Sequence, residues 1–138
     1  MTSQALGKTL ALGALTGMRS MAGPTALAFR HAGLLRTVVG AMAAAEMIAD
    51  KTSVVGDRID PIPLAGRALM GAVVGGAIAY EDQASIAIGG LAGALAAVAA
   101  AHLAYHARKR LAAGSVAGGF VEDAIVVGLT SMAVRQRV

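Results

Sequence analysis

Residues 83–107 read QASIAIGGLAGALAAVAAAHLAYHA, a run of 25 residues without lysine, arginine, aspartate or glutamate. A helix of about 20 apolar residues spans the hydrocarbon core of a bilayer, so this run is long enough to cross a membrane. Four other apolar segments accompany it, and each of them contains or adjoins charged residues. We therefore predict an all-α, polytopic membrane bundle that forms one transmembrane domain over residues 1–138. Its five helices are predicted over residues 6–29, 33–51, 64–80, 84–107 and 116–134.

The composition of the chain agrees with this class. Its 138 residues are 57% hydrophobic and 14% charged, with a mean hydropathy of +0.67. Soluble domains carry about 25% charged residues, and a core of this size cannot bury so much apolar surface. A soluble enzyme and a disordered chain are therefore excluded. The 18 glycines are typical of closely packed membrane helices, and three G-x-x-x-G pairs predict close crossings: Gly13/Gly17, Gly71/Gly75 and Gly89/Gly93.

The basic residues lie at the edges of the apolar segments. This pattern indicates control of membrane topology and not nucleic-acid binding, although the formal net charge is +4. With five spans, seven Lys and Arg residues lie on one side and four on the other, which predicts a cytoplasmic N-terminus and an external C-terminus. The chain has no cysteine, which excludes disulfides and thiolate chemistry.

An internal repeat appears when the chain is shifted by 76 residues. Between residues 11–50 and 87–126, nine of forty positions are identical, and Glu46 falls on Glu122. The shift places the first predicted helix on the fourth and the second on the fifth. Because it moves the chain by three spans, it predicts inverted-topology repeats, over about 10–51 and 86–134, around a central helix at 64–80.

Several short motifs extend over nearly the whole chain: Gly17-Met18-Arg19-Ser20, Glu46-x-x-x-Asp50-Lys51, Gly66-Arg67, Tyr105-His106-Ala107-Arg108 and Glu122-Asp123. In order and spacing they resemble the family of small bacterial membrane proteins known as domain of unknown function 4126. The resemblance implies a multi-pass protein of the bacterial cytoplasmic (inner) membrane whose polar intramembrane residues belong to the family pattern. It implies no particular activity.

Polar residues inside the predicted helices are the candidate site for an ion or substrate: Arg19, Ser20, Glu46, Asp50, Glu122 and Asp123. A charge at the centre of a membrane helix costs about 2.5–3.5 kcal/mol, so it is usually paired or lines a cavity. The repeat predicts that Glu46 faces Glu122, with Arg19 as counter-charge. Such a group is either a proton or cation site or a structural ion pair that joins helices.

The first predicted helix contains helix-breaking residues. Gly23 and Pro24 predict a break or bend between Gly17 and Pro24, with free N–H groups that suit an anion; an ordinary proline kink is the alternative. His102 and His106 have the spacing of metal ligands but lack a third ligand in the sequence, so neither a metal nor a cofactor is predicted.

These features leave three functions open. We expect a small transporter or channel-like protein, completed by homo-oligomerisation with a dimer favoured, that acts on a small ion or molecule in the lipid bilayer. A structural or accessory membrane assembly protein is the alternative. An intramembrane enzyme acting on lipid is less favoured, because no nucleophile or metal set accompanies the acidic residues.

Overall fold

The computed structural model describes residues 1–29, 33–49, 59–110, 124–129 and 131–132, and the regular structure in these residues is helical. The principal helices are α1 (Ser3–Met18), α2 (Ala22–Ala28), α3 (Leu34–Ala49), α4 (Pro61–Glu81) and α5 (Ile86–Arg110). A short helix covers residues 124–129. The predicted all-α class is confirmed. The predicted number of five helices is not, because the described part of the chain contains six.

The extra helix comes from the N-terminal segment. The single helix predicted over residues 6–29 is wrong, because α1 ends at Met18 and α2 starts at Ala22. The helices predicted over 33–51, 64–80 and 84–107 are found with shifted ends. α4 begins three residues early because Pro61 and Pro63 fit in the first turn, where a missing N–H has no helical partner to lose. Of the helix predicted over 116–134, only the parts at 124–129 and 131–132 lie within the described residues.

Two helices are long and apolar enough to cross a membrane, Pro61–Glu81 and Ile86–Ala107. Length and composition alone are weak evidence, since a core helix of a soluble protein has the same properties. A core helix is mostly buried, however, whereas only 39% and 22% of these two apolar segments are buried. Their outward faces expose large apolar side chains, among them Leu69, Val73, Leu91, Leu95 and Leu103. The burial pattern therefore favours helices surrounded by lipid.

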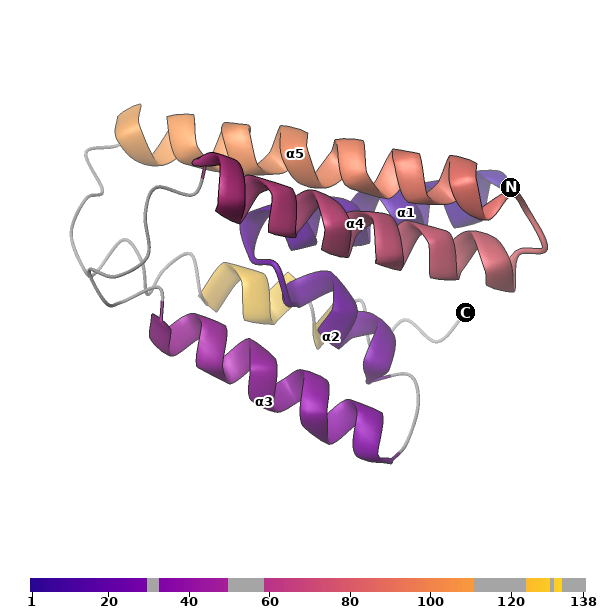
Figure 1. Cartoon of the computed structure of the whole chain (residues 1–138), viewed down its shortest axis with the longest axis horizontal. Coiled ribbons are helices and arrows are strands. Elements are labelled where there is room, and N and C mark those ends of the chain that lie inside the picture. Colours follow the sequence, from indigo (N-terminus) through magenta and orange to yellow (C-terminus); the bar gives the residue numbers. More distant parts are fainter. Residues whose placement is uncertain (30–32, 50–58, 111–123, 130, 133–138) are drawn as a thin grey trace.

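The helices α1, α4 and α5 pack against one another as a three-helix unit (Figure 1). Glycines set their separation. Gly71 and Gly75 of α4 face Gly93 and Gly89 of α5, respectively, so these two helices are antiparallel. A Cβ atom on Gly93 would lie 3.1 Å from the Cα of Gly75 and nearer still to the carbonyl oxygen of Gly71. The backbones therefore approach as closely as the G-x-x-x-G spacing predicted.

α1 packs in this unit parallel to α5. Gly13 faces Gly93 and Gly17 faces Ala97, a constant offset that makes α1 and α5 parallel. This direction conflicts with the inverted repeat, which requires the first and fourth predicted helices to run in opposite directions. The repeat is therefore not reproduced in these helices. The three G-x-x-x-G pairs are all buried inside the chain, so they do not offer a surface to a second copy.

The second layer consists of α2, which contacts α1 and α4, and α3, which packs on α2 (Figure 1). α2 folds back along α1. A Cβ atom on Gly23 would lie 2.7 Å from the carbonyl oxygen of Leu12, although eleven residues of straight helix would separate the two by about 16 Å. The segment predicted as one span is therefore a helical hairpin. As a result, the N-terminus lies at the α4–α5 turn and not at the basic end of α5, where the predicted topology placed it (Figure 1).

We expect Gly93→Ala to destabilise the fold, because the added methyl group collides with the backbone of α4, where no side chain is available to move aside. Overpacking of this kind costs about 1–3 kcal/mol. Thermal unfolding in detergent, followed by circular dichroism, measures the effect. Gly7→Ala is the matched control, since nothing lies within 4 Å of that position and alanine favours helix. Equal melting temperatures for the two variants would contradict the close packing of α4 and α5.

Candidate functional site

The turn between α1 and α2 leaves two backbone amides without helical acceptors. Arg19 still donates its N–H to the carbonyl of Leu15 at 2.9 Å, and Ala22 donates to the carbonyl of Arg19 at 3.0 Å. In a continuous helix Ser20 and Met21 would donate to Thr16 and Gly17. The break between Gly17 and Pro24 is therefore confirmed. Pro24 lies in the first turn of α2, where it disrupts no hydrogen bond.

Glu46 of α3 satisfies both amides. Its Oε1 accepts from the Ser20 N–H at 2.8 Å, and its Oε2 accepts from the Met21 N–H at 2.9 Å. Each carboxylate oxygen thus receives one backbone donor, and the side chain ties α3 to the start of α2. The break does present N–H groups to an anion, as its sequence predicted, but the anion in the structure is the protein's own Glu46. Hydrogen bonds to a charged group contribute about 1.5–3 kcal/mol each.

The glycine contacts fix the depth of this turn. Gly17 faces Ala97, which is near the middle of the apolar stretch Ile86–Ala107. At 1.5 Å per residue, Ala97 lies about 16 Å from Ile86 and about 15 Å from Ala107. Arg19 lies two residues after Gly17 and is only 4% exposed. The backbone of Arg19 and the turn that Glu46 holds are therefore near the middle of this apolar stretch.

A second arginine is buried at the same level. Gly71 also packs against Gly93 and Ala97, and Arg67 precedes it by one turn on α4, with only 3% of its surface exposed. The pattern of basic residues at the edges of the apolar segments predicts that Arg67 lies near a membrane surface. That assignment is corrected, because α4 begins at Pro61 and places Arg67 in its second turn, on an inward face. The Asp60-Pro61 pair, a common helix start, was the signal that could have located it.

We refer to Arg19, Arg67, Glu46 and the Ser20–Met21 backbone as the polar centre. Three of the predicted site residues, Arg19, Ser20 and Glu46, belong to it. Asp50, Glu122 and Asp123 lie outside the described residues, so the predicted approach of Glu46 to Glu122 stays a prediction. The free N–H groups were predicted, but their pairing with Glu46 was not, because it depends on a contact between distant parts of the chain.

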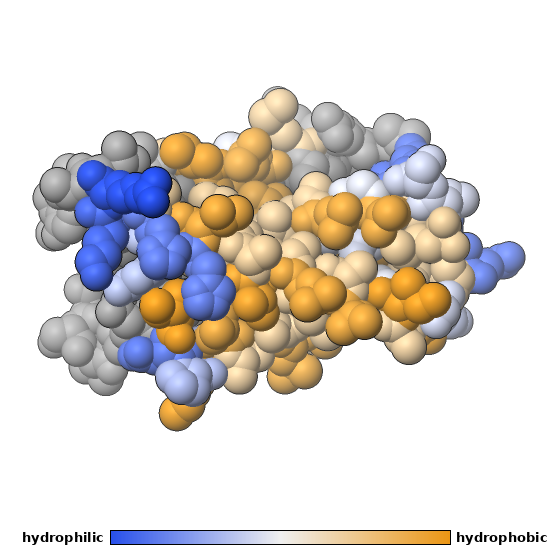
Figure 2. Space-filling model, turned by 90° about the horizontal axis from the view of Figure 1, so that it is seen from above, coloured by the Kyte–Doolittle hydropathy of each residue, from blue (hydrophilic) through white to orange (hydrophobic). Residues whose placement is uncertain are grey.

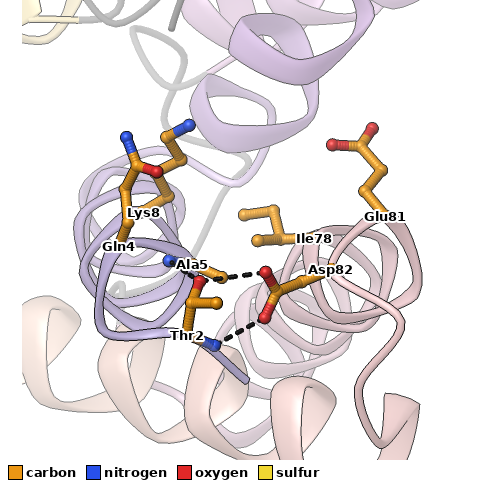
Figure 3. Close-up of a pocket in the computed structure, with 7 residues that line it drawn as sticks. All are labelled: Thr2, Gln4, Ala5, Lys8, Ile78, Glu81 and Asp82. Atoms are coloured by element: carbon orange, nitrogen blue, oxygen red, sulfur yellow. Dashed lines mark hydrogen bonds between the residues drawn. The ribbon is translucent and has the colours of Figure 1, made fainter.

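A separate polar group connects the N-terminus to the α4–α5 turn. The carboxylate of Asp82 accepts from the Thr2 N–H at 2.6 Å and from the Thr2 hydroxyl at 2.9 Å (Figure 3). Thr2 in turn caps α1, because its Oγ1 accepts from the Ala5 N–H at 3.2 Å. Lys8 and Glu81 project beside a hollow of about 170 Å³ next to this group (Figure 3). The hydrogen bonds from Thr2 hold the pKa of Asp82 below the ordinary aspartate value of 3.8.

Residues with metal-binding chemistry do not cluster in the described part of the chain. No group of three or more His, Asp or Glu side chains is placed to hold a metal ion there. His102 and His106 share a face of α5, and the ring of His106 meets Tyr105 edge-on, with centroids 5.4 Å apart. Comparison with known proteins found no family model, no curated protein and no solved structure that matches this chain.

We expect Glu46→Gln to loosen the α1–α2 turn. A glutamine amide offers one oxygen, and its NH₂ group faces a second N–H, so at least one of the two hydrogen bonds is lost. The free energy of unfolding should fall by about 2 kcal/mol. Hydrogen exchange should accelerate at the amides of Ser20 and Met21 in particular. Glu81→Gln, which removes the same charge at the far end of α4, should leave exchange at those amides unchanged.

Acid should release the N-terminus from the α4–α5 turn. The pKa of Asp82 is lower in the folded protein than in the unfolded chain, so its contribution to stability is complete above the ordinary value of 3.8 and is lost as the pH falls through the folded value. Asp82→Asn should lower stability at pH 7 and flatten its dependence on pH below 4. Melting temperatures measured from pH 7 down to pH 2 test this. If the melting temperature of Asp82→Asn fell with pH as steeply as that of the wild type, other carboxyl groups would be responsible for the loss of stability in acid.

Proposed function

We propose that the chain is a small multi-pass protein of the bacterial inner membrane that moves a small ion or molecule across the bilayer at the polar centre. The observation that carries the proposal is the turn at Ser20–Met21, held by Glu46 near the middle of an apolar span. Irregular backbone at membrane depth occurs only where protein buries it or where it lines a cavity. Interrupted helices of this kind often supply the solute site of a transporter.

The charges of the polar centre support the same proposal. Arg19 and Arg67 are both buried among apolar helices, where a charged side chain is costly and usually serves an ion or solute pathway. Glu46 is only partly buried and is the acidic member of the centre. Protonation would remove its charge and one of its acceptor sites, and the α1–α2 turn would then be free to open. Glu46 therefore has the chemistry of a protonatable gate.

The membership of the chain in the family of domain of unknown function 4126 is part of the proposal and rests on the motifs alone. The five spans predicted from the apolar segments would have to be counted differently, because α1 and α2 form a hairpin. A dimer would need a surface other than the buried G-x-x-x-G faces. The outer faces of α4 and α5 are one such surface.

A structural or accessory role in membrane assembly is the second candidate. It is favoured by the hydrogen bonds of Glu46, because both carboxylate oxygens are already satisfied by the chain's own backbone. In that role the carboxylate only fastens α3 to the α1–α2 turn. The two candidates predict different effects of the same substitution.

Proteoliposomes loaded with a pH-sensitive dye separate the two candidates. As a transporter or channel, the wild type should carry protons or support proton-coupled flux in gradients of sodium, potassium or chloride, above the leak of empty vesicles. Glu46→Gln should lower this flux at least tenfold per folded, reconstituted molecule, because it cannot take up or release a proton. Glu81→Gln, the charge-matched control, should retain the flux.

Two results would overturn transport in favour of assembly. The first is a wild type that carries none of these ions above the leak. The second is a Glu46→Gln variant that melts at a lower temperature but, while folded, retains the whole wild-type flux.

A further inference from the structure

The last turns of α5 carry an exposed group of basic side chains. His106, Lys109 and Arg110 are all exposed there. Lys109 lies over the ring of Tyr105, with its Nζ 5.9 Å from the ring centroid. We call these four residues the basic end of α5. A tyrosine beside lysine and arginine at the end of an apolar helix is the arrangement found where membrane helices meet the headgroup layer.

The basic end continues directly from an apolar surface. Leu95 and Leu103 of α5 are 61% and 71% exposed, and they lie about two turns apart on the stretch that leads to the basic end. In Figure 2, which looks down onto α5, hydrophobic side chains cover the middle of the molecule and hydrophilic ones gather at the end where α5 finishes. An acyl chain lying along the leucines would therefore bring its own headgroup to Lys109 and Arg110.

The opposite end of the same helices has a different charge balance. The α4–α5 turn carries Glu81 and Asp82, with Lys8 nearby as the cation of the adjacent hollow. That end combines both signs of charge, whereas the described side chains of the basic end are cationic or neutral. An anionic headgroup is attracted to the basic end and meets carboxylates at the other.

We propose that the basic end of α5 binds the phosphate headgroups of anionic phospholipids in the adjoining leaflet. The apolar stripe of α5 holds the acyl chains, and Lys109 and Arg110 supply the charge that selects an anionic lipid over a zwitterionic one. The inference rests on the membrane placement in the proposed function but not on transport. A protein without ion flux would leave it standing.

Binding of fluorescent phosphatidylglycerol to the full chain in neutral detergent tests the proposal, with labelled phosphatidylcholine as the zwitterionic reference. Each cation near an anionic headgroup strengthens binding about fivefold, so Lys109→Gln/Arg110→Gln should weaken phosphatidylglycerol binding on the order of 25-fold. Its affinity for phosphatidylcholine should change little. High salt should reduce the preference of the wild type, because about 1 M salt screens charges beyond about 3 Å.

Lys8→Gln/Arg36→Gln is the matched control, because it removes the same charge from α1 and α3 and leaves the basic end of α5 intact. It should keep the preference for phosphatidylglycerol. Equal loss in both double variants would show that net charge, and not the basic end, selects the lipid. Equal binding of the two lipids by the wild type would also overturn the proposal. The proposal would also be overturned if inorganic phosphate, at the same concentration as the lipid, displaced all of the bound phosphatidylglycerol. The site would then recognise phosphate alone. Circular dichroism confirms that each variant is folded.

Discussion

Close contact between the backbones of α4 and α5 at Gly71, Gly75, Gly89 and Gly93 is the constraint on which the arrangement of this protein depends. Side chains at these positions would separate the helices, and the gain from dispersion and from weak contacts between backbones would be lost. The same seam accepts α1, whose Gly13 and Gly17 lie against Gly93 and Ala97. Three helices of different length thereby acquire one register, and that register decides the depth of every polar residue upon them.

The polar centre is a consequence of that register. α1 is shorter than α5, so it ends beside the middle of α5, where the chain turns and two amides lose their helical acceptors. Glu46 supplies acceptors from a helix that otherwise packs on α2. The cost of a carboxylate at this depth is offset by two hydrogen bonds and by satisfying amides that would be expensive to leave unpaired. Stability and any gating role therefore depend on one side chain.

The two ends of the bundle, on either side of the polar centre, differ chemically. Asp82 fastens the N-terminus to the α4–α5 turn, so this end is closed by hydrogen bonds within the protein. The end of α5 has exposed cations beside exposed leucines and faces outward. Polar side chains at one end are therefore hydrogen-bonded within the protein, whereas basic side chains at the other end are exposed. The molecule is chemically asymmetric along its long axis.

The sequence by itself determined the helical class, the apolar stretch Ile86–Ala107, the close glycine contacts and the break before Pro24, because these depend on composition and on neighbours within a few residues. It also singled out Arg19, Ser20 and Glu46. Only the tertiary structure decided that α2 folds back on α1, that α1 and α5 are parallel, and that Arg67 is interior. The direction of the chain after a break depends on distant contacts such as Glu46 with Ser20 and Met21. A hydropathy pattern does not record them, because a kinked span and a hairpin contain the same residues.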